Sequence, residues 1–467
     1  MKKLISLIPL ALLCIAAFAQ NGAITPSMLE QISKGWKGDA SDRALRNAVG
    51  QTSLNTLAIN AENAAMINTD FSDKVKTSGI TDQKSSGRCW LFTGLNVLRA
   101  AAIDKYNLGN FQFSQNYCFF WDQLEKANLF LQAVIDTRDK PFEDREVDWL
   151  FSNPIGDGGT FTGVANLVTK YGLVPSDVMP ETAVANSTGQ MSSHLRVLLR
   201  QDGLKLRGIA ADAGLDKLKG AKAKKAAAAL ETRLQEEKTA MLAEVYHVLA
   251  LCLGVPPTEF EWKGEKKTPV QFYRELLGYD LEGGYVMLMN DPSREYGKVY
   301  EIQYDRHMYD GQNWLYVNLP VERIKEMAIA SIKANTAMYF SCDVGKFLDR
   351  KRGVADLNNF DYESLLGVKF TMDKKERILT HSSGSSHAMT LMAVDLKEGK
   401  PVKWMVENSW GADSGYRGHI IMTDEWFDNY MFRLVVEKRF VPADVMAMLQ
   451  QEPVMLPAWD PMYMPEE

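Results

Sequence analysis

Residues 83–99, QKSSGRCWLFTGLNVLR, are the most informative segment of the sequence. It places Cys89 at the expected start of a helix with apolar residues on more than one side, which predicts a helix deep in the core. We expect Ser85 and Ser86 to cap this helix, with Gly87 giving the turn its freedom. In the first turn, the helix dipole and unpaired N–H groups favour the thiolate, the nucleophilic form of cysteine. Taken alone, the helix fits equally well a small apolar residue that fills a gap in the core.

The residues around Cys89 favour catalysis. Gln83 lies six residues before it (89 − 83), where its amide could donate to a developing oxyanion together with the Cys89 backbone N–H. A glutamine, a Ser/Gly-rich turn and Cys-Trp resemble the papain-like cysteine peptidases. The sequence QKSSGRCWLF more closely resembles one branch of that group, the bleomycin hydrolases and bacterial aminopeptidases C. In it, Arg88 stands in place of the small residue usual in papain itself.

A base and the residue that orients it are predicted far along the chain. His387 stands in SSGSSHAMTLMAVD at the entry to a β run, and Asn408 follows 21 residues later (408 − 387) in VENSWG. A cysteine protease needs an imidazole to protonate the leaving amine, and an amide oxygen fixes the imidazole tautomer. Alone, His387 also fits a core histidine and Asn408 a turn. The combination HAMT…NSWGxxxGYxG resembles the family motifs, which implies these two roles and a shielding role for Trp410. The other five histidines lack this context.

A glycine pair precedes another expected helix in DGGTFTGVANLVTKYGLVP. Two glycines allow close backbone approach to a ligand, although a plain turn is the simpler interpretation of the pattern alone. The resemblance implies that Gly158 and Gly159 line the substrate cleft and pair with the peptide backbone.

The order of patterns along the 467 residues predicts an α+β protein. The resemblance implies a papain-like two-lobed fold, a helical lobe and a β-barrel-like lobe. The 298 residues between Cys89 and His387 (387 − 89) exceed the roughly 130–150 typical of papain-like enzymes, which predicts a large helical insertion. We expect the following parts: an N-terminal arm at 20–70, the helical lobe at 71–189, the insertion at 190–280, the β-barrel-like lobe at 281–440 and a C-terminal arm at 441–467.

Residues 1–19 predict a secretory signal peptide. Lys2 and Lys3 form a basic start, residues 4–18 are mostly apolar, and Ala-Phe-Ala at 17–19 fits a cleavage site. A membrane anchor is the alternative, but the run is too short to span a bilayer. We therefore expect an exported protein, periplasmic or secreted, with no membrane contact once the signal is removed.

The net charge and the cysteine pattern limit which partners and cofactors we expect. The net charge of −6 gives no reason to expect polyanion binding, and the lysines at 217–225 are followed by acids with no aromatic platform. A solvated helix face is preferred there over a nucleic-acid site. No CxxC or zinc pattern is present, so Cys118, Cys252 and Cys342 are expected to be buried thiols rather than a disulfide framework. The chemistry needs no metal and no organic cofactor.

The C-terminal sequence bears on the class of substrate. LPAWDPM at 456–462 resembles an arm that packs along the cleft in this family, where the terminal carboxylate meets the amine of the substrate. The ending YMPEE departs from the usual Gly-Ala-rich end, but Glu467 with its terminal carboxylate still supplies negative charge. We expect a cysteine aminopeptidase that acts on peptides with a free N-terminus and forms a homohexamer by family resemblance. The alternatives are an endopeptidase with an open cleft and a non-catalytic binder of nucleic acid or peptide.

Overall fold

The computed structural model describes residues 22–64, 67–215 and 218–463. The predicted signal peptide, Lys217 and Glu467 lie outside these ranges. The described chain forms two compact units, one from the chain up to Ile59 with Asp361–Val368, and one from Asn60–Phe360 with the chain from Lys369 onward. No helix in the described ranges is long and apolar enough to cross a membrane.

The first unit consists of short capped helices. Thr25, Asp39 and Ser53 each accept a backbone N–H from the first turn of the helix that follows, which satisfies one of the donors left open there. Within this unit, the Asp361 backbone N–H donates to the Ala58 carbonyl at 2.7 Å. Its helices are α1 (Pro26–Ser33), α2 (Ala40–Val49), α3 (Leu54–Leu57) and α13 (Tyr362–Leu366).

The second unit is built on a mixed sheet that has 12 strands among the described residues. The order is β14-β5-β6-β4-β13-β7-β10-β11-β12-β9-β8, with β1 paired to β10. Its strands are β1 (Asp73–Lys74), β4 (Tyr285–Met289), β5 (Val299–Ile302), β6 (Leu315–Asn318), β7 (Met338–Cys342), β8 (Leu348–Asp349), β9 (Val354–Ala355), β10 (His387–Lys397), β11 (Lys400–Glu407), β12 (His419–Thr423), β13 (Met431–Glu437) and β14 (Val454–Leu456).

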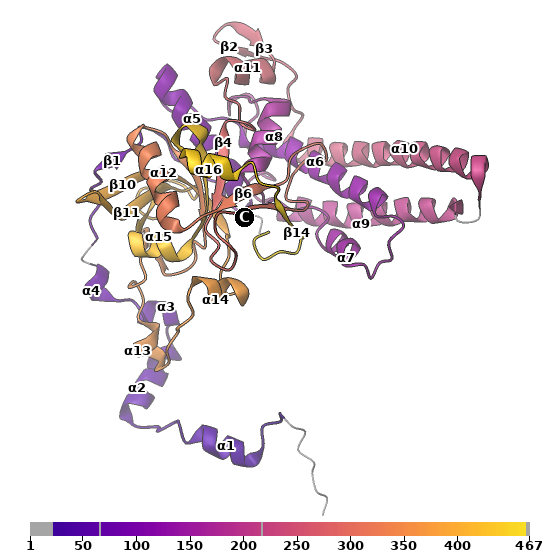
Figure 1. Cartoon of the computed structure of the whole chain (residues 1–467). Coiled ribbons are helices and arrows are strands. Elements are labelled where there is room, and N and C mark those ends of the chain that lie inside the picture. Colours follow the sequence, from indigo (N-terminus) through magenta and orange to yellow (C-terminus); the bar gives the residue numbers. More distant parts are fainter. Residues whose placement is uncertain (1–21, 65–66, 216–217, 464–467) are drawn as a thin grey trace, which may run out of the picture. The chain divides into compact units, whose positions relative to one another are not determined.

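Helices pack against this sheet and against one another (Figure 1). Helix α5 (Cys89–Tyr106) lies against β10 and α8 (Phe161–Tyr171). Helix α6 (Gln115–Asp136) contacts α5, α8, α9 (Gly189–Asp212) and α10 (Gly220–Leu253). The remaining helices of this unit are α4 (Ala61–Ala64), α7 (Arg145–Ser152), α8 (Phe161–Tyr171), α11 (Pro269–Leu276), α12 (Val321–Lys333), α14 (Lys374–Leu379), α15 (Asp424–Tyr430), the 3-10 helix η2 (Lys438–Phe440) and α16 (Ala443–Met448).

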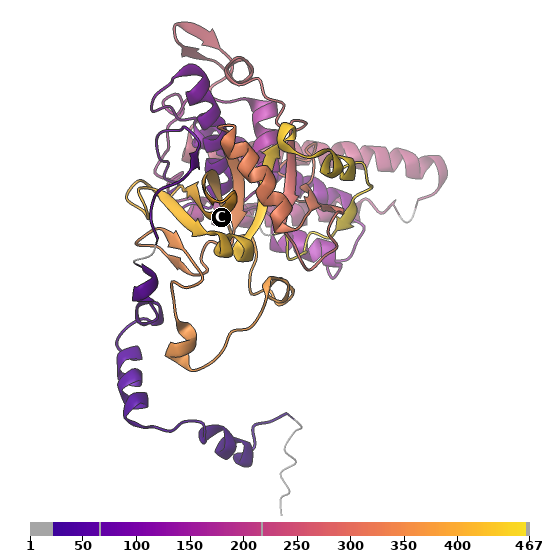
Figure 2. The ribbon, with the colours of Figure 1, turned by 60° about the vertical axis from the view of Figure 1, so that its left-hand side comes forward.

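Two long helices occupy most of the region predicted as an insertion. Helices α9 (Gly189–Asp212) and α10 (Gly220–Leu253) lie side by side and extend away from the sheet of their unit (Figures 1 and 2). Lys222, Lys224 and Lys225 are exposed on α10, as expected for a solvated face. A small hairpin, β2 (Phe260–Trp262) and β3 (Glu265–Lys267), and then α11 follow these helices.

Strands lie where the sequence predicts a β-barrel-like lobe, at 281–440. This range contains β4, β5, β6, β7, β10, β11, β12 and β13, together with helix α12. These strands follow residues that are β-branched, aromatic or otherwise apolar and are buried along almost their whole length. The α+β class is therefore confirmed.

Candidate active site

Cys89 is the first residue of α5 and is fully buried. The helix is buried along its first three turns because Trp90, Leu91 and Leu95 all belong to the hydrophobic core, as predicted. The predicted caps are wrong: Arg88 occupies the N-cap position and makes no side-chain cap bond. Ser85 instead forms a bridge with Ser187, so tertiary pairing of the loop overrides the local capping preference.

The sheet brings His387 and Asn408 together. His387 begins β10 and Asn408 follows the last residue of β11, and these strands are antiparallel neighbours with Thr390 opposite Glu407. The His387 Nε2 lies 2.9 Å from the Asn408 Oδ1. The Ser409 backbone N–H donates to the same oxygen at 2.8 Å, which fixes the orientation of the amide. Because an amide oxygen can only accept, this contact favours the tautomer of His387 in which Nε2 carries the proton.

The cysteine lies beside the same strand. The backbone N–H of Ala388 donates to the Cys89 Sγ at 3.4 Å, so the sulfur contacts the residue that follows His387. The packing of α5 against β10 produces this contact. Residues 298 positions apart in the sequence (387 − 89) thus lie on facing elements of one site.

Trp410 covers the histidine. Its ring centroid lies 4.9 Å from that of His387 at an interplanar angle of 34°. The Arg350 guanidinium lies 4.9 Å from the Trp410 centroid. An indole beside a buried imidazole lowers the local access of water, which strengthens the His387–Asn408 hydrogen bond.

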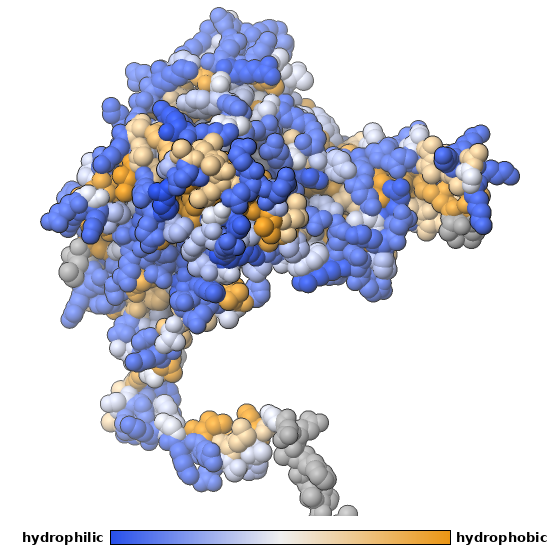
Figure 3. Space-filling model, viewed as in Figure 1, coloured by the Kyte–Doolittle hydropathy of each residue, from blue (hydrophilic) through white to orange (hydrophobic). Residues whose placement is uncertain are grey.

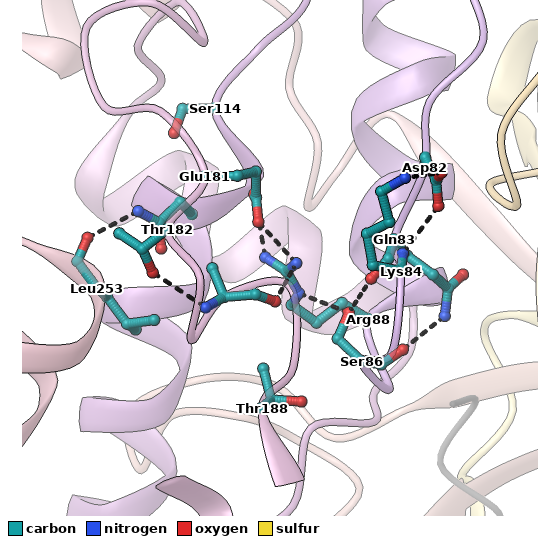
Figure 4. Close-up of polar contacts among 12 residues, drawn as sticks. Asp82, Gln83, Lys84, Ser86, Arg88, Ser114, Glu181, Thr182, Thr188 and Leu253 are labelled. Atoms are coloured by element: carbon teal, nitrogen blue, oxygen red, sulfur yellow. Dashed lines mark hydrogen bonds and ion pairs between the residues drawn. The ribbon is translucent and has the colours of Figure 1, made fainter. Parts of the chain in front are cut away.

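Gln83 is buried in the loop before α5 (Figure 4). Its Nε2 donates to the Ser86 carbonyl at 2.7 Å, and its Oε1 accepts from the Ser409 hydroxyl at 2.6 Å. Its backbone N–H donates to the Ser409 carbonyl at 2.8 Å. The amide is therefore fixed at both ends, and its second N–H remains to serve a ligand, because a primary amide carries two donors.

Gly158 and Gly159 border a cavity of about 790 Å³. A Cβ built on Gly159 would lie 2.1 Å from the His307 Cε1, so only glycine fits at this position beside the His307 ring. The Lys126 Nζ donates to the Gly158 carbonyl at 2.7 Å and holds the loop from behind. The C-terminal residues 458–461 and 463 line the same cavity.

A model of the family described as "Peptidase C1-like family" matches residues 23–463. The chain belongs to this family. It is 40% identical over 403 residues to a bleomycin hydrolase of Mus musculus, covering 82% of this chain and 85% of the relative. It is 34% identical over 440 residues to an aminopeptidase C of Lactobacillus delbrueckii subsp. lactis, covering 91% and 93%. The solved structure of pepw from Lactobacillus rhamnosis matches with a TM-score of 0.86 at 34% identity, covering 95% of this chain and 99% of that one. The resemblance inferred from QKSSGRCWLF and the papain-like fold are confirmed.

One part of the site in this Peptidase C1-like chain was missed from the sequence. His307 carried no motif, yet it is buried, its Nδ1 lies 2.5 Å from the Asp122 Oδ1, and its ring packs edge-on against Trp90 at 4.6 Å. Burial lowers the pKa of His307, and Lys126 lowers it further against the opposing effect of Asp122. Burial alone would raise the pKa of Asp122, but Lys126 and His307 lower it overall, so the carboxylate stays charged.

The local sequence held only a partial signal for this cluster. Asp122 interrupts an aromatic, apolar stretch, and a buried carboxylate needs a partner, but nothing near it identifies a residue 185 positions away (307 − 122). Among the described residues, no group of three or more His, Cys, Asp or Glu side chains could hold a metal ion. Cys118 and Cys342 are buried as expected, whereas Cys252 is only partly buried, because it lies at a more exposed position near the end of α10.

Proposed function

We propose that this chain is a cysteine aminopeptidase in which Cys89 is the nucleophile, His387 the base and acid, and Asn408 the residue that orients the imidazole. One observation carries this proposal: the Cys89 sulfur accepts from the backbone N–H of Ala388, next to His387, while the Nε2 of that imidazole lies 2.9 Å from the Asn408 Oδ1. The names of the relatives, bleomycin hydrolase and aminopeptidases C, G and W, support this activity.

The reaction follows from the roles of these groups. The Cys89 thiolate attacks the scissile carbonyl carbon, a C–S bond forms, and the π electrons move to the carbonyl oxygen. The Cys89 backbone N–H and the second N–H of the Gln83 amide stabilise this oxyanion. When the C–N bond breaks, the His387 imidazolium gives its proton to the leaving amine. Water, deprotonated by His387, then attacks the thioester, and the C–S bond breaks to release the acid and restore the thiolate.

The C-terminal arm is proposed to restrict the enzyme to free N-termini. Strand β14 pairs in parallel with β5, the Asp460 carboxylate forms an ion pair with Arg294, and the Arg433 Nη2 donates to the Met462 carbonyl at 2.6 Å. These contacts fix the arm where it borders the cavity next to Gly158 and Gly159. We propose that the carboxylates of Glu467, which lies outside the described residues, receive the substrate ammonium. Opposite charges attract more strongly in a low-dielectric cleft, so a carboxylate there favours the binding of a peptide with a free N-terminal ammonium over that of an acetylated peptide.

The experiment compares the wild type with a chain lacking residues 465–467. A long peptide with a free amine is digested under reducing conditions, and the products are measured by mass. We expect the wild type to remove residues from the N-terminus and to leave the acetylated peptide intact, and the shortened chain to cut internally. Equal cleavage of the acetylated and free peptides by the wild type would contradict the role of the tail and favour an endopeptidase.

Assembly and export are separate proposals. We propose a homohexamer, supported by apolar side chains that α9 and α10 leave exposed, among them Val197, Leu204 and Leu251. Figure 3 shows apolar surface over these two long helices. Val197 and Leu204 lie seven residues apart and so share one helix face. Sedimentation of the wild type against Val197→Glu/Leu204→Glu tests assembly, with a shift to smaller species expected. We also propose export through residues 1–19, and a mature protein that retains Met1 would contradict it.

A further inference from the structure

Arg88, the residue directly before Cys89, is a fully buried cation. Its guanidinium forms a two-pronged ion pair with Glu181, Nη1 to Oε1 at 3.1 Å and Nη2 to Oε2 at 2.8 Å. The same Nη2 donates to the Ala185 carbonyl at 2.6 Å, and Nε donates to the Ser86 hydroxyl at 2.9 Å. Phe92 and Phe119 pack against the guanidinium, whose central carbon lies 5.1 and 5.2 Å from their ring centroids. Only a planar fork of donors serves all these partners at once.

The Arg88 contacts continue to the catalytic groups through Ser86 (Figure 4). The Ser86 hydroxyl, which accepts from Arg88, donates to the Gln83 carbonyl at 2.6 Å. The Ser86 carbonyl accepts from the Gln83 amide at 2.7 Å. Ser86 therefore holds Gln83 by both its backbone and its side chain, and the guanidinium fixes the Ser86 hydroxyl in the orientation that this requires.

From Gln83 the same hydrogen-bond chain reaches the imidazole. The Gln83 Oε1 accepts from the Ser409 hydroxyl, and the Ser409 N–H donates to the amide oxygen of Asn408, which lies against His387. A single network thus runs from Glu181 through Arg88, Ser86 and Gln83 to Asn408. Shifts at its Arg88 end change the position of the oxyanion donors first. Gln83 is two hydrogen bonds away from Arg88, through Ser86, and the Cys89 backbone N–H belongs to the next residue of the chain.

The outer end of the network is itself fixed. The Asn116 Nδ2 donates to the carbonyl of Pro180 at 2.9 Å and to that of Leu253 at 2.7 Å. The Thr182 hydroxyl donates to the Cys252 carbonyl at 2.8 Å and accepts the Ala185 N–H at 3.0 Å. Glu181 and Ala185, the two partners of Arg88, therefore lie on a segment tied to the C-terminal end of α10.

We propose that Arg88 and Glu181 are positioning residues for the reaction, which set the Ser86 turn so that the Gln83 amide and the Cys89 backbone N–H converge on the oxyanion. The inference rests on the proposed function. The ion pair then acts on the step in which negative charge develops on the substrate carbonyl oxygen. It has no role in forming the thiolate, because His387 and the N-terminal end of α5 serve that purpose.

The test separates these two effects in Arg88→Lys and Glu181→Gln. Arg88→Lys keeps the charge and loses the fork, and Glu181→Gln leaves Arg88 in place while removing its counter-charge. Turnover of an aminoacyl amide gives kcat and KM. The rate of iodoacetamide alkylation at Cys89, followed by mass across pH, reports the thiolate alone, since that reaction forms no oxyanion. Lys325→Met is the matched control, because Lys325 is buried and pairs with Asp424 at 2.8 Å, on helices outside the network.

We expect kcat to fall about 10- to 100-fold in both variants, with KM and the pH profile of alkylation within about twofold of wild type. The Lys325→Met variant should lose stability and keep its kcat. A kcat within about twofold of wild type in either folded variant would overturn the proposal. Parallel losses of kcat, alkylation rate and melting temperature would also overturn it, in favour of a role in folding only. If Arg88→Lys does not fold, Glu181→Gln decides. Turnover by the wild type is measured in the same assay. If the wild type shows no turnover, the proposed function itself is contradicted.

Discussion

The Nε2 of His387 lies 2.9 Å from the Oδ1 of Asn408. His387 is the first residue of β10, and Asn408 directly follows the last residue of the neighbouring strand β11. We predict that Asn408→Ala lowers kcat by about 10- to 100-fold. An imidazole that rotates freely loses part of the roughly 10²–10⁴-fold rate enhancement that general acid–base catalysis supplies. Steady-state assays on an aminoacyl amide measure the loss. A variant that keeps full kcat would show that the amide does not orient the base.

Gly159 should not tolerate a side chain. In Gly159→Ala the new Cβ would meet the His307 ring, so the loop must move, and we expect a loss of about 1–3 kcal/mol in the free energy of unfolding. Urea denaturation measures it. Gly208→Ala, on α9 with open space around the added methyl, is the matched control and should be neutral or stabilising. Gly159→Ala should cost less in a His307→Ala background than in the wild type, and an equal cost in both backgrounds would place the strain elsewhere.

The buried ion pair of Arg99 and Glu407 connects α5 to β11. Both side chains are 1% exposed, and burial raises the pKa of Glu407 while Arg99 opposes that rise. Arg99→Met leaves a buried carboxylate without its counter-charge, so we expect a loss of about 3–5 kcal/mol in the free energy of unfolding. Urea denaturation of Arg99→Met and of Arg99→Met/Glu407→Leu provides the comparison. The double variant should be the more stable of the two, and the reverse order would contradict the electrostatic explanation.

Lys374 should make stability depend on pH. It is buried and donates to the Asn290 Oδ1 at 2.6 Å, and burial lowers its pKa to about 7, against an opposing effect of Asp428. The unfolded lysine titrates near 10.4, so between about pH 7 and 10 the unfolded chain binds more protons. Stability therefore rises with pH across that window, by at most about 1.4 kcal/mol per unit.

Urea denaturation of wild type and Lys374→Met from pH 6.5 to 9 isolates this effect from other titrating groups. The stability of the wild type minus that of the variant should increase with pH. A difference that stays constant over the range would mean that Lys374 remains charged throughout.

The sequence was sufficient wherever a motif is local. QKSSGRCWLF and SSHAMT each keep their residues within a few positions, so Cys89 could be assigned to a helix start and His387 to the entry of a β run, and the structure places them there. The capping role of Ser85 could not be judged locally, since the loop pairs with Ser187 instead. His307 and Asp122 were beyond prediction for a related reason, because their pairing arises only from packing between distant elements. The catalytic roles themselves remain predictions that the variants above will test.

The distance in sequence between the thiol and its base has a consequence for biosynthesis. A ribosome delivers the helix that carries Cys89 long before β10 and β11 exist, so a partly synthesised chain holds a sulfur with no proton acceptor beside it. In the proposed mechanism, hydrolysis therefore becomes possible only when the segment that carries His387 and Asn408, in the last fifth of the polypeptide, has emerged and folded.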